Sequence, residues 1–281
     1  MIENRLGAGR DLVIAMLLLL AVPMVLAPGG IAAQSGLGDL DAVLSNSATP
    51  RTPRMERDAL DANAPLAPIV IDGVLDDAEW ANGKVFTDFT QAQPVEGAPV
   101  EHDTEVRFII GDEAIWIAAR MYDPEPESIV RRLTRRDSHG AFDNFVIQLD
   151  PNLDGLTGYV FGVSASNVQT DMYLYNDDKL DGAWDAVWSS AVKVDAEGWT
   201  AEVRIPLSQI RYEASDEEQT WGINFYRSRV SSNEQSYYSL VSRLKKGRVS
   251  QMGRVDGVRV TRPSRRLEVL PYVVSSLHNG P

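Results

Sequence analysis

The chain has 281 residues, of which 44% are hydrophobic and 24% charged, a composition typical of one or two globular domains. Its formal net charge is −13, with 27 Lys and Arg against 40 Asp and Glu. This balance argues against a nucleic-acid partner, because phosphate binding needs clusters of basic residues. The sequence contains no cysteine, which excludes disulfides, thiolate catalysis and Cys-based zinc sites.

The N-terminal segment has the three-part layout of a secretory signal. Arg5 and Arg10 precede an apolar run over 12–26, and a Pro-Gly-Gly break and small residues follow the run. We therefore expect a signal peptide over 1–33 and an exported protein, in the periplasm or associated with the outer membrane. An uncleaved anchor helix is the alternative, although the run is short for spanning a bilayer and Pro23 interrupts it. Residues 34–66 are rich in Gly, Ser, Asp, Ala and Pro, which predicts a flexible linker.

The first motif of the folded region is "IVIDGVLDDAEW", residues 69–80. It begins as a strand and turns at Asp-Gly, after which Asp76 is a good N-cap and Glu79 falls at the third helical position. Leu75 and Trp80 are spaced to pack on each other as a hydrophobic staple. The acids are therefore expected to start a short helical turn, and a binding role for them is the alternative.

Short β-rich runs separated by turn signals follow in chain order. The expected strands cover 104–110, 114–123, 143–150, 157–166, 168–177, 191–206 (a hairpin) and 221–230, with helical turns at 76–81 and 206–210. Strands of this length with a turn signal every dozen residues predict an all-β fold, an antiparallel β-sandwich. Trp116, Trp199 and Trp221 lie inside strand patterns and are expected in the core.

Several of these segments occur in a characteristic order. "IDGVLDDAEW", "TEVRFIIGDEAIWIAARMYDPEP", "DNFVIQLDP", "GYVFGVSASNVQTD", "WDAVW" and "GWTAEVRIPLSQIRY" together resemble the family 9 carbohydrate-binding module and its DOMON-like relatives. With "RRD", the chain is similar to the form of this module found ahead of an outer-membrane β-barrel of unknown function. The resemblance implies a jelly-roll or immunoglobulin-like sandwich over 67–262. It also implies that 263–281, which contains "RRLEVLPYVVSS", begins the following barrel.

One set of candidate sugar-binding residues comes from the strand "DMYLYND". Asp171, Tyr173 and Tyr175 share one face of this strand, and Met172 and Leu174 share the other. If the apolar pair faces the core, the tyrosines project onto the open face of the sheet. Exposed aromatic rings beside polar groups suit a glycan, because rings stack on sugar C–H faces while polar groups bind hydroxyls.

Two loops supply the remaining candidates. Trp184 and Asp185 stand in the acidic segment "DGAWDAVWSS", and Arg136 and Asp137 belong to "RRD". Relatives clamp a terminal sugar between two aromatic residues, and the resemblance implies Trp184 as one of them without identifying its partner. The alternatives are that Trp184 and Trp188 are core residues, and that the arginine-rich loop is a solvated, salt-bridged connection.

A metal site is suggested by "DPNLDG", in which Asp150, Asn152 and Asp154 are spaced like the first half of a calcium loop. The twelfth position is Phe161 rather than Glu, so a hairpin turn is the alternative. The acidic loop over 176–182 is a second place where calcium could bind, since relatives often carry a structural calcium. No other cofactor is expected, and the three widely spaced histidines lack the pattern of a zinc site.

These features favour an exported, non-catalytic module that binds a poly- or oligosaccharide. Relatives are fused to glycoside hydrolases such as xylanases, but the sequence contains no nucleophile elbow, phosphate loop or paired-His motif. The first alternative is an accessory or plug-like domain of an outer-membrane β-barrel that binds protein. The second is a haem-binding DOMON-like domain, which needs axial Met or His ligands. The sequence offers no compelling pair, since Met172 and His139 would meet only by chance.

Overall fold

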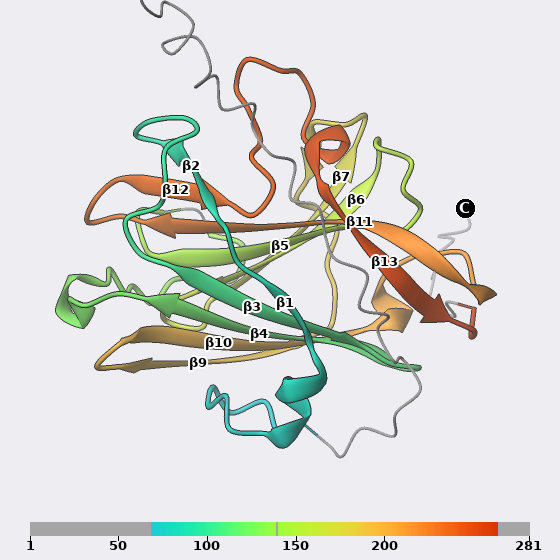
Figure 1. Ribbon diagram of the computed structural model, residues 1–281, viewed down its shortest axis with the longest axis horizontal. Coiled ribbons are helices and arrows are strands. Elements are labelled where there is room, and N and C mark those ends of the chain that lie inside the picture. The colour runs from blue at the N-terminus through green and yellow to red at the C-terminus, as the bar shows by residue number, and fades with distance from the viewer. Residues whose placement is uncertain (1–68, 139, 264–281) are drawn as a thin grey trace, which may run out of the picture. The chain divides into compact units, whose positions relative to one another are not determined.

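The computed structural model describes residues 69–138 and 140–263, which form two antiparallel β-sheets packed face to face (Figure 1). The predicted signal peptide, the predicted linker and residues 264–281 of the predicted barrel start lie outside the described residues. Among the described residues, no helix is long and apolar enough to cross a membrane.

The smaller sheet has five strands in the order β1-β3-β4-β10-β9. Their bounds are β1 Lys84–Phe86, β3 Thr104–Ile110, β4 Ala114–Tyr122, β10 Gly198–Pro206 and β9 Ser189–Asp195. The larger sheet has eight strands in the order β2-β12-β11-β5-β6-β7-β8, with β13 also paired to β11. Their bounds are β2 Thr90–Gln93, β12 Glu234–Tyr237, β11 Ser215–Arg229, β5 Asn144–Asp150, β6 Gly158–Ser164, β7 Gln169–Tyr175, β8 Lys179–Asp181 and β13 Gly253–Val260.

The antiparallel β-sandwich predicted from the sequence is confirmed, and each strand expected between 104 and 230 is present. Residues 69–71, which were expected to end a strand, are not part of one. The helical segments of the described residues are short 3-10 helices: η1 Ala78–Asn82, η2 Pro126–Ser128, η3 Leu207–Gln209 and η4 Val249–Gln251. β11 begins at Ser215, six residues before the expected start at Trp221.

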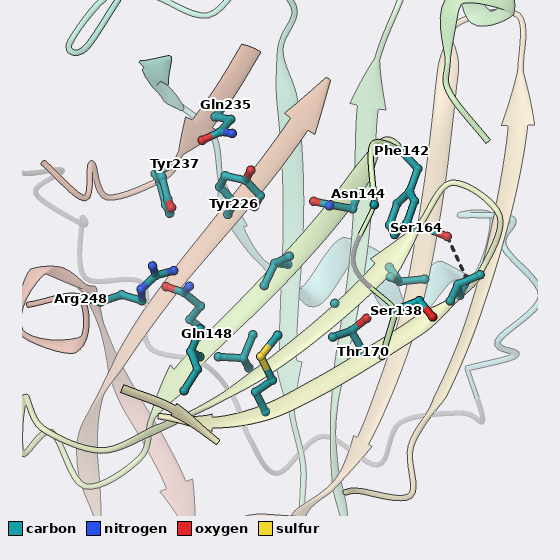
Figure 2. Close-up of a pocket in the computed structure, with 18 residues that line it drawn as sticks. Ser138, Phe142, Asn144, Gln148, Ser164, Thr170, Tyr226, Gln235, Tyr237 and Arg248 are labelled. Carbon is teal, nitrogen blue, oxygen red and sulfur yellow. Dashed lines mark hydrogen bonds between the residues drawn. The ribbon is translucent and has the colours of Figure 1, made fainter. Parts of the chain in front are cut away.

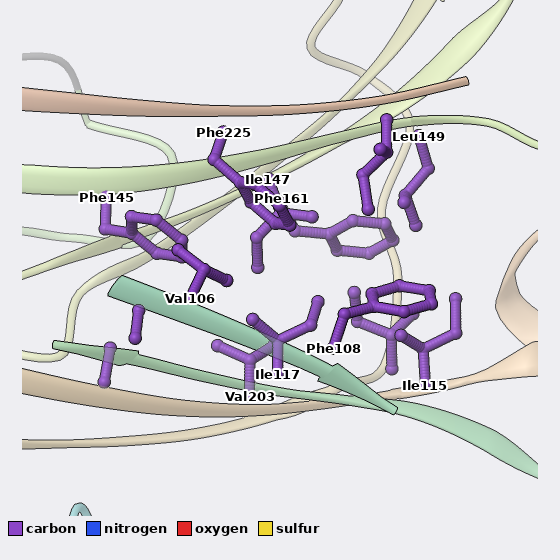
Figure 3. Packing of buried hydrophobic residues seen from close by; sticks show 14 of the residues in the cluster. Val106, Phe108, Ile115, Ile117, Phe145, Ile147, Leu149, Phe161, Val203 and Phe225 are labelled. Carbon is purple, nitrogen blue, oxygen red and sulfur yellow. The ribbon is translucent and has the colours of Figure 1, made fainter. Parts of the chain in front are cut away.

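The core lies between the two sheets, where alternate residues of each strand meet (Figure 3). Phe86 on β1 contacts Phe225 on β11 across the two sheets, with ring centroids 5.2 Å apart, and Phe145 stacks on Phe225 within the larger sheet. Trp199 and Trp221 are fully buried, as expected, whereas Trp116 is only partly buried and packs on the outer face of the smaller sheet. The centre of the core is apolar, and Arg227 and Arg229, on the inward face of β11, are buried farther along, where they donate hydrogen bonds to the Tyr122 carbonyl and the Asp123 carboxylate.

The outer face of the five-stranded sheet is covered by the segment that carries the first motif (Figure 1). Trp80 packs there with Ile109 and Ala118, and Leu75 joins the same cluster. The predicted capping box is wrong: the N-cap of η1 is Asp77, which caps no helix amide, and its Oδ2 instead accepts a hydrogen bond from the Val70 N–H at 3.0 Å. The expected short helical turn is therefore present as η1, but Asp77 closes the preceding loop onto itself instead of capping that turn.

A buried carboxylate from β10 fixes this segment in place. Glu202 is 0% exposed and accepts hydrogen bonds from the N–H groups of Asp72 and Gly73, at 2.9 and 2.8 Å, and from Nε1 of Trp80 at 3.1 Å. Burial raises the pKa of Glu202. Gly73 has a φ of +88°, and a Cβ there would lie 2.9 Å from the Val192 carbonyl carbon. The Asp-Gly turn is therefore required for close approach to the sheet.

Candidate functional site

The strand that was expected to display tyrosines, β7, has its faces the other way round. Leu174 is fully buried on the outer face of the larger sheet, in a cluster with Val249 of η4 that Met172 joins. Tyr173 points inward instead and contacts Tyr159, with ring centroids 5.4 Å apart. The expectation was wrong because η4 buries the outer face at this point, which the alternation of β7 alone does not reveal. Tyr175 lies on the same face as Tyr173, at the end of the strand, and is 40% exposed.

The two tryptophans of "WDAVW" lie at the border of the core. Trp184 is half-buried, with its ring centroid 5.2 Å from that of Tyr159 and 5.7 Å from that of Phe161. Trp188 is buried, and its centroid lies 5.5 Å from that of Phe161. The ring of Trp184 therefore packs on core aromatics and does not lie on the open face of the larger sheet.

The charged candidates do come together, around a buried carboxylate. Asp171 is 1% exposed, forms an ion pair with Arg136, and accepts hydrogen bonds from the Ala186 N–H at 2.6 Å and from Trp188 Nε1 at 3.3 Å. Asp137 accepts the N–H of Asp171 at 3.1 Å.

Asp185 completes this network from its exposed side, 3.3 Å from Arg136 Nη2. Burial raises the pKa of Asp171 despite its partners. The two loop motifs and β7 are therefore tied together by their own ionic groups, so much of their bonding capacity is already used within the protein.

Replacing Asp171 with Asn is expected to lower the free energy of unfolding by about 3 kcal/mol, because the amide would face the donors of Arg136, Ala186 and Trp188. Urea denaturation followed by tryptophan fluorescence measures this loss. Asp185→Asn, at a side chain that is 77% exposed, is the matched control and should cost less than about 0.5 kcal/mol. Equal losses in the two variants would contradict this structural role.

The expected calcium loop is a hairpin turn whose carboxylates bind their own backbone. Asp150 accepts the N–H of Gly155 at 2.9 Å, and Asp154 accepts the N–H and Oγ1–H of Thr157 at 2.7 and 2.6 Å. Asn152 is exposed at the tip. Within 69–138 and 140–263 no group of three or more His, Cys, Asp or Glu side chains could hold a metal ion. The structure thus gives no support for a calcium site.

A groove of about 360 Å³ lies on the outer face of the eight-stranded sheet (Figure 2). One row of neighbouring residues crosses β12, β11, β5, β6 and β7 beneath it, in the order Tyr237, Tyr226, Val146, Gly162 and Thr170. Side chains on these positions project to the same face. Because the fourth position is glycine, the row has two aromatic rings at one end and a hollow toward the other.

The groove contains polar atoms without partners in the protein. Asn144 Oδ1 and Gln148 Oε1 have no hydrogen bond to the described residues, and Gln148 is only 3% exposed. Both residues are on β5 and on the same face as Val146: Asn144 lies two residues before it and Gln148 two residues after it. Unpaired buried acceptors are rare and call for a ligand or ordered water. These two oxygens therefore mark the groove as a place where hydroxyl donors can bind.

Two tyrosines form the aromatic wall of the groove. The rings of Tyr226 and Tyr237 have centroids 4.9 Å apart at an interplanar angle of 50°. Burial raises the pKa of Tyr226 to about 12 and also raises that of Tyr237. A tyrosine phenol is protonated at neutral pH with or without this shift, so each can donate a hydrogen bond beside an apolar ring surface.

Sequence reasoning missed this groove for an identifiable reason. In "GINFYRS" the buried residues Phe225 and Arg227 flank Tyr226, so alternation alone could have placed Tyr226 on the outer face. The sequence does not reveal that β12 pairs with β11 and brings Tyr237 beside that ring.

Two solved structures of one module show a similar fold. A family 9 carbohydrate-binding module from Caldicellulosiruptor kristjanssonii, solved in complex with cellotriose and in complex with glucose, is 19% identical to this chain in each case. Each match has a TM-score of 0.50 and covers 73% of this chain and 96% of the module. The chain has the family 9 carbohydrate-binding fold. No protein-family model matches the chain, and no curated protein matches it significantly.

An identity of 19% establishes the family 9 fold alone. The location of a binding site on this fold has to be argued from the residues of this chain. In the described residues, the arguments from shape, aromatic surface and unpaired acceptors converge on the groove of the larger sheet.

Proposed function

We propose that this protein is a non-catalytic carbohydrate-binding module that holds an oligo- or polysaccharide in the groove of the eight-stranded sheet. The observation that carries the proposal is the pairing of two tyrosine rings with unpartnered amide oxygens in a cavity of ligand size. The rings offer apolar surface to the C–H face of a sugar, and the oxygens accept hydrogen bonds from its hydroxyls. The sugars bound by the modules of similar fold support the same class of ligand.

This proposal moves the site away from the residues first predicted. The network of Asp171 and Arg136 is occupied by internal bonds, and Trp184 packs on core aromatics. Asn144 Oδ1 and Gln148 Oε1, in contrast, are unpaired. The groove therefore has free bonding capacity that the network lacks.

We also propose, from the N-terminal residues, that the protein is exported and acts in the periplasm or at the outer membrane. The supporting feature is the charged, apolar and small-residue layout of 1–33. An outer-membrane β-barrel following residue 262 is part of the same proposal, and it rests on the likeness of "RRLEVLPYVVSS" to a first barrel strand. Both are tested by fractionating cells that express the gene and probing each fraction for the protein.

Affinity electrophoresis of the full-length chain through gels containing soluble xylan, glucan, mannan or pectin tests the sugar site. Retardation in at least one gel is expected, and Tyr237→Ala should weaken it about tenfold through loss of the stacking surface. Tyr175→Ala is the matched control, since Tyr175 is exposed on β7 and does not line the groove.

The two tyrosine variants distinguish the two surfaces. Retardation that is lost in Tyr175→Ala and kept in Tyr237→Ala would return the site to the surface first predicted from the sequence. Absence of retardation in every gel would refute sugar binding by this module.

A further inference from the structure

A second hollow of about 650 Å³, lined by a basic loop, lies beside one end of the groove. Gln235, Tyr237 and Arg248 line both cavities, so the two are neighbours. The loop between β12 and η4 supplies four cationic side chains to the second hollow: Arg243, Lys245, Lys246 and Arg248.

The carboxylates near these cations are fewer, and one of them is fully engaged. Asp177 and Asp178 are the acids that line the second hollow. Asp177 accepts the N–H groups of Arg248 and Ser250, at 3.0 and 2.9 Å, and the hydroxyl of Ser250 at 2.8 Å. Glu96 is a third carboxylate at this loop and accepts the N–H of Arg243 at 3.3 Å. Four cations against three carboxylates leave this end of the groove positive, although the whole chain carries −13.

The basic loop is held in a defined position. Its Gly247 has a φ of +88°, and a Cβ there would overlap the carboxylate of Asp177, so the loop packs directly against the β7–β8 turn. The backbone oxygen of Asp177 also accepts the N–H groups of Arg248 and Val249, at 2.9 and 3.1 Å. These backbone contacts hold in place the loop that carries the cations, which favours a site prepared before ligand binding.

Arg248 brings a positive charge to the aromatic wall. Its Nε is buried without a hydrogen bond and lies 3.8 Å from Asp178 Oδ1. Figure 2 shows its guanidinium on the side of the groove that also holds Gln148, Tyr226 and Tyr237. A planar guanidinium can bind both oxygens of a carboxylate at once, which makes it a specific partner for that group.

We propose that the groove takes a glycan that carries carboxylate groups, a uronate, with the carboxylate at Arg248 and the sugar ring beside Tyr226 and Tyr237. This inference rests on the proposed sugar-binding function. Lys245 and Lys246 are exposed, and neither forms an ion pair with another described residue, so they extend the positive surface toward the next acidic sugar. The net charge of −13 repels a polyanion elsewhere on the protein, so binding depends on this end of the groove.

Calorimetric titration of the full-length chain with trigalacturonate and with its methyl ester tests the proposal, because esterification removes the charge of each carboxyl group and adds only a methyl group. The acid is expected to bind about tenfold more tightly than the ester. Arg248→Gln should weaken binding of the acid about tenfold and leave the ester unchanged. Lys245→Gln/Lys246→Gln, at exposed positions, should weaken only the acid, about threefold.

The matched control is Arg131→Gln/Arg132→Gln, which removes two charges from exposed positions outside both cavities and should leave both affinities unchanged. Equal affinity for acid and ester, or equal effects of Arg248→Gln on the two, would overturn the uronate proposal while leaving sugar binding intact. Retardation by neutral glucan together with no binding of either titrant would do the same. No binding in any gel or titration would instead overturn the proposed function itself.

Discussion

Replacing Gly162 with methionine is expected to abolish glycan binding, lowering affinity roughly a hundredfold or more. Gly162 lies on the floor of the groove, and a Cβ there would meet Val146 Cγ2 at 3.5 Å and Thr170 Cβ at 3.6 Å, which are ordinary contacts. The backbone therefore tolerates a side chain at this position, while the rest of the methionine fills the space meant for the sugar. The loss is measured by affinity electrophoresis in whichever glycan retards the wild type.

The folded state should not suffer from this change. Glycine weakens a strand interior, so Gly162→Met is expected to leave the melting temperature unchanged or slightly raised. Gly182→Met is the matched control, because Gly182 lies in a loop with nothing within 4 Å of a Cβ, and it should bind like the wild type. A Gly162→Met protein that keeps its affinity would show that sugar binds elsewhere.

Glu202→Ala is expected to lower the free energy of unfolding by about 3 to 5 kcal/mol. The change strips the N–H groups of Asp72 and Gly73 and the indole of Trp80 of their shared acceptor, and all three then remain buried or partly buried without it. Chemical denaturation of the purified variant measures the loss, and near-ultraviolet circular dichroism should report a changed environment for a tryptophan.

A second glutamate, in a turn between two strands of the same sheet, provides the comparison. Glu197, in the β9–β10 turn, is 71% exposed and forms an ion pair with Arg120 at 3.0 Å. Glu197→Ala should therefore cost less than about 1 kcal/mol. If both variants lose the same stability, Glu202 does not anchor the segment before β1 in the way that its hydrogen bonds indicate.

Strand positions were predictable because the sandwich repeats a simple local pattern. The β3–β4 hairpin follows from two β-rich runs and an intervening turn signal, and alternation along these strands predicts which residues face the core between the sheets. The family resemblance added connectivity, which single-strand patterns do not encode. Short strands such as β8 and β12, each of three or four residues, carry too little pattern to be recognised alone.

The site was not predictable to the same degree because it depends on which elements meet across the sheet. On β7 both faces are substantially buried, Leu174 beneath η4 and Tyr173 against Tyr159, so alternation could not distinguish inside from outside. The structure brings the charged residues of the two loops together, but the sequence could not show that Asp171 would be satisfied within the protein. The groove needed Tyr226 beside Tyr237, and although β11 and β12 follow each other in the chain, the four residues of β12 carry too little pattern to be recognised.

The hydrogen bonds that Glu202 accepts from Asp72, Gly73 and Trp80 also fix the side of the sandwich at which the chain enters the fold. Ile69 enters the fold beside Trp80, on the outer face of the five-stranded sheet, whereas the groove lies on the outer face of the other sheet. Whatever lies ahead of residue 69 is thus joined at the back of the sandwich. The chain therefore enters the described fold on the side opposite to the groove and to its wall of Tyr226 and Tyr237.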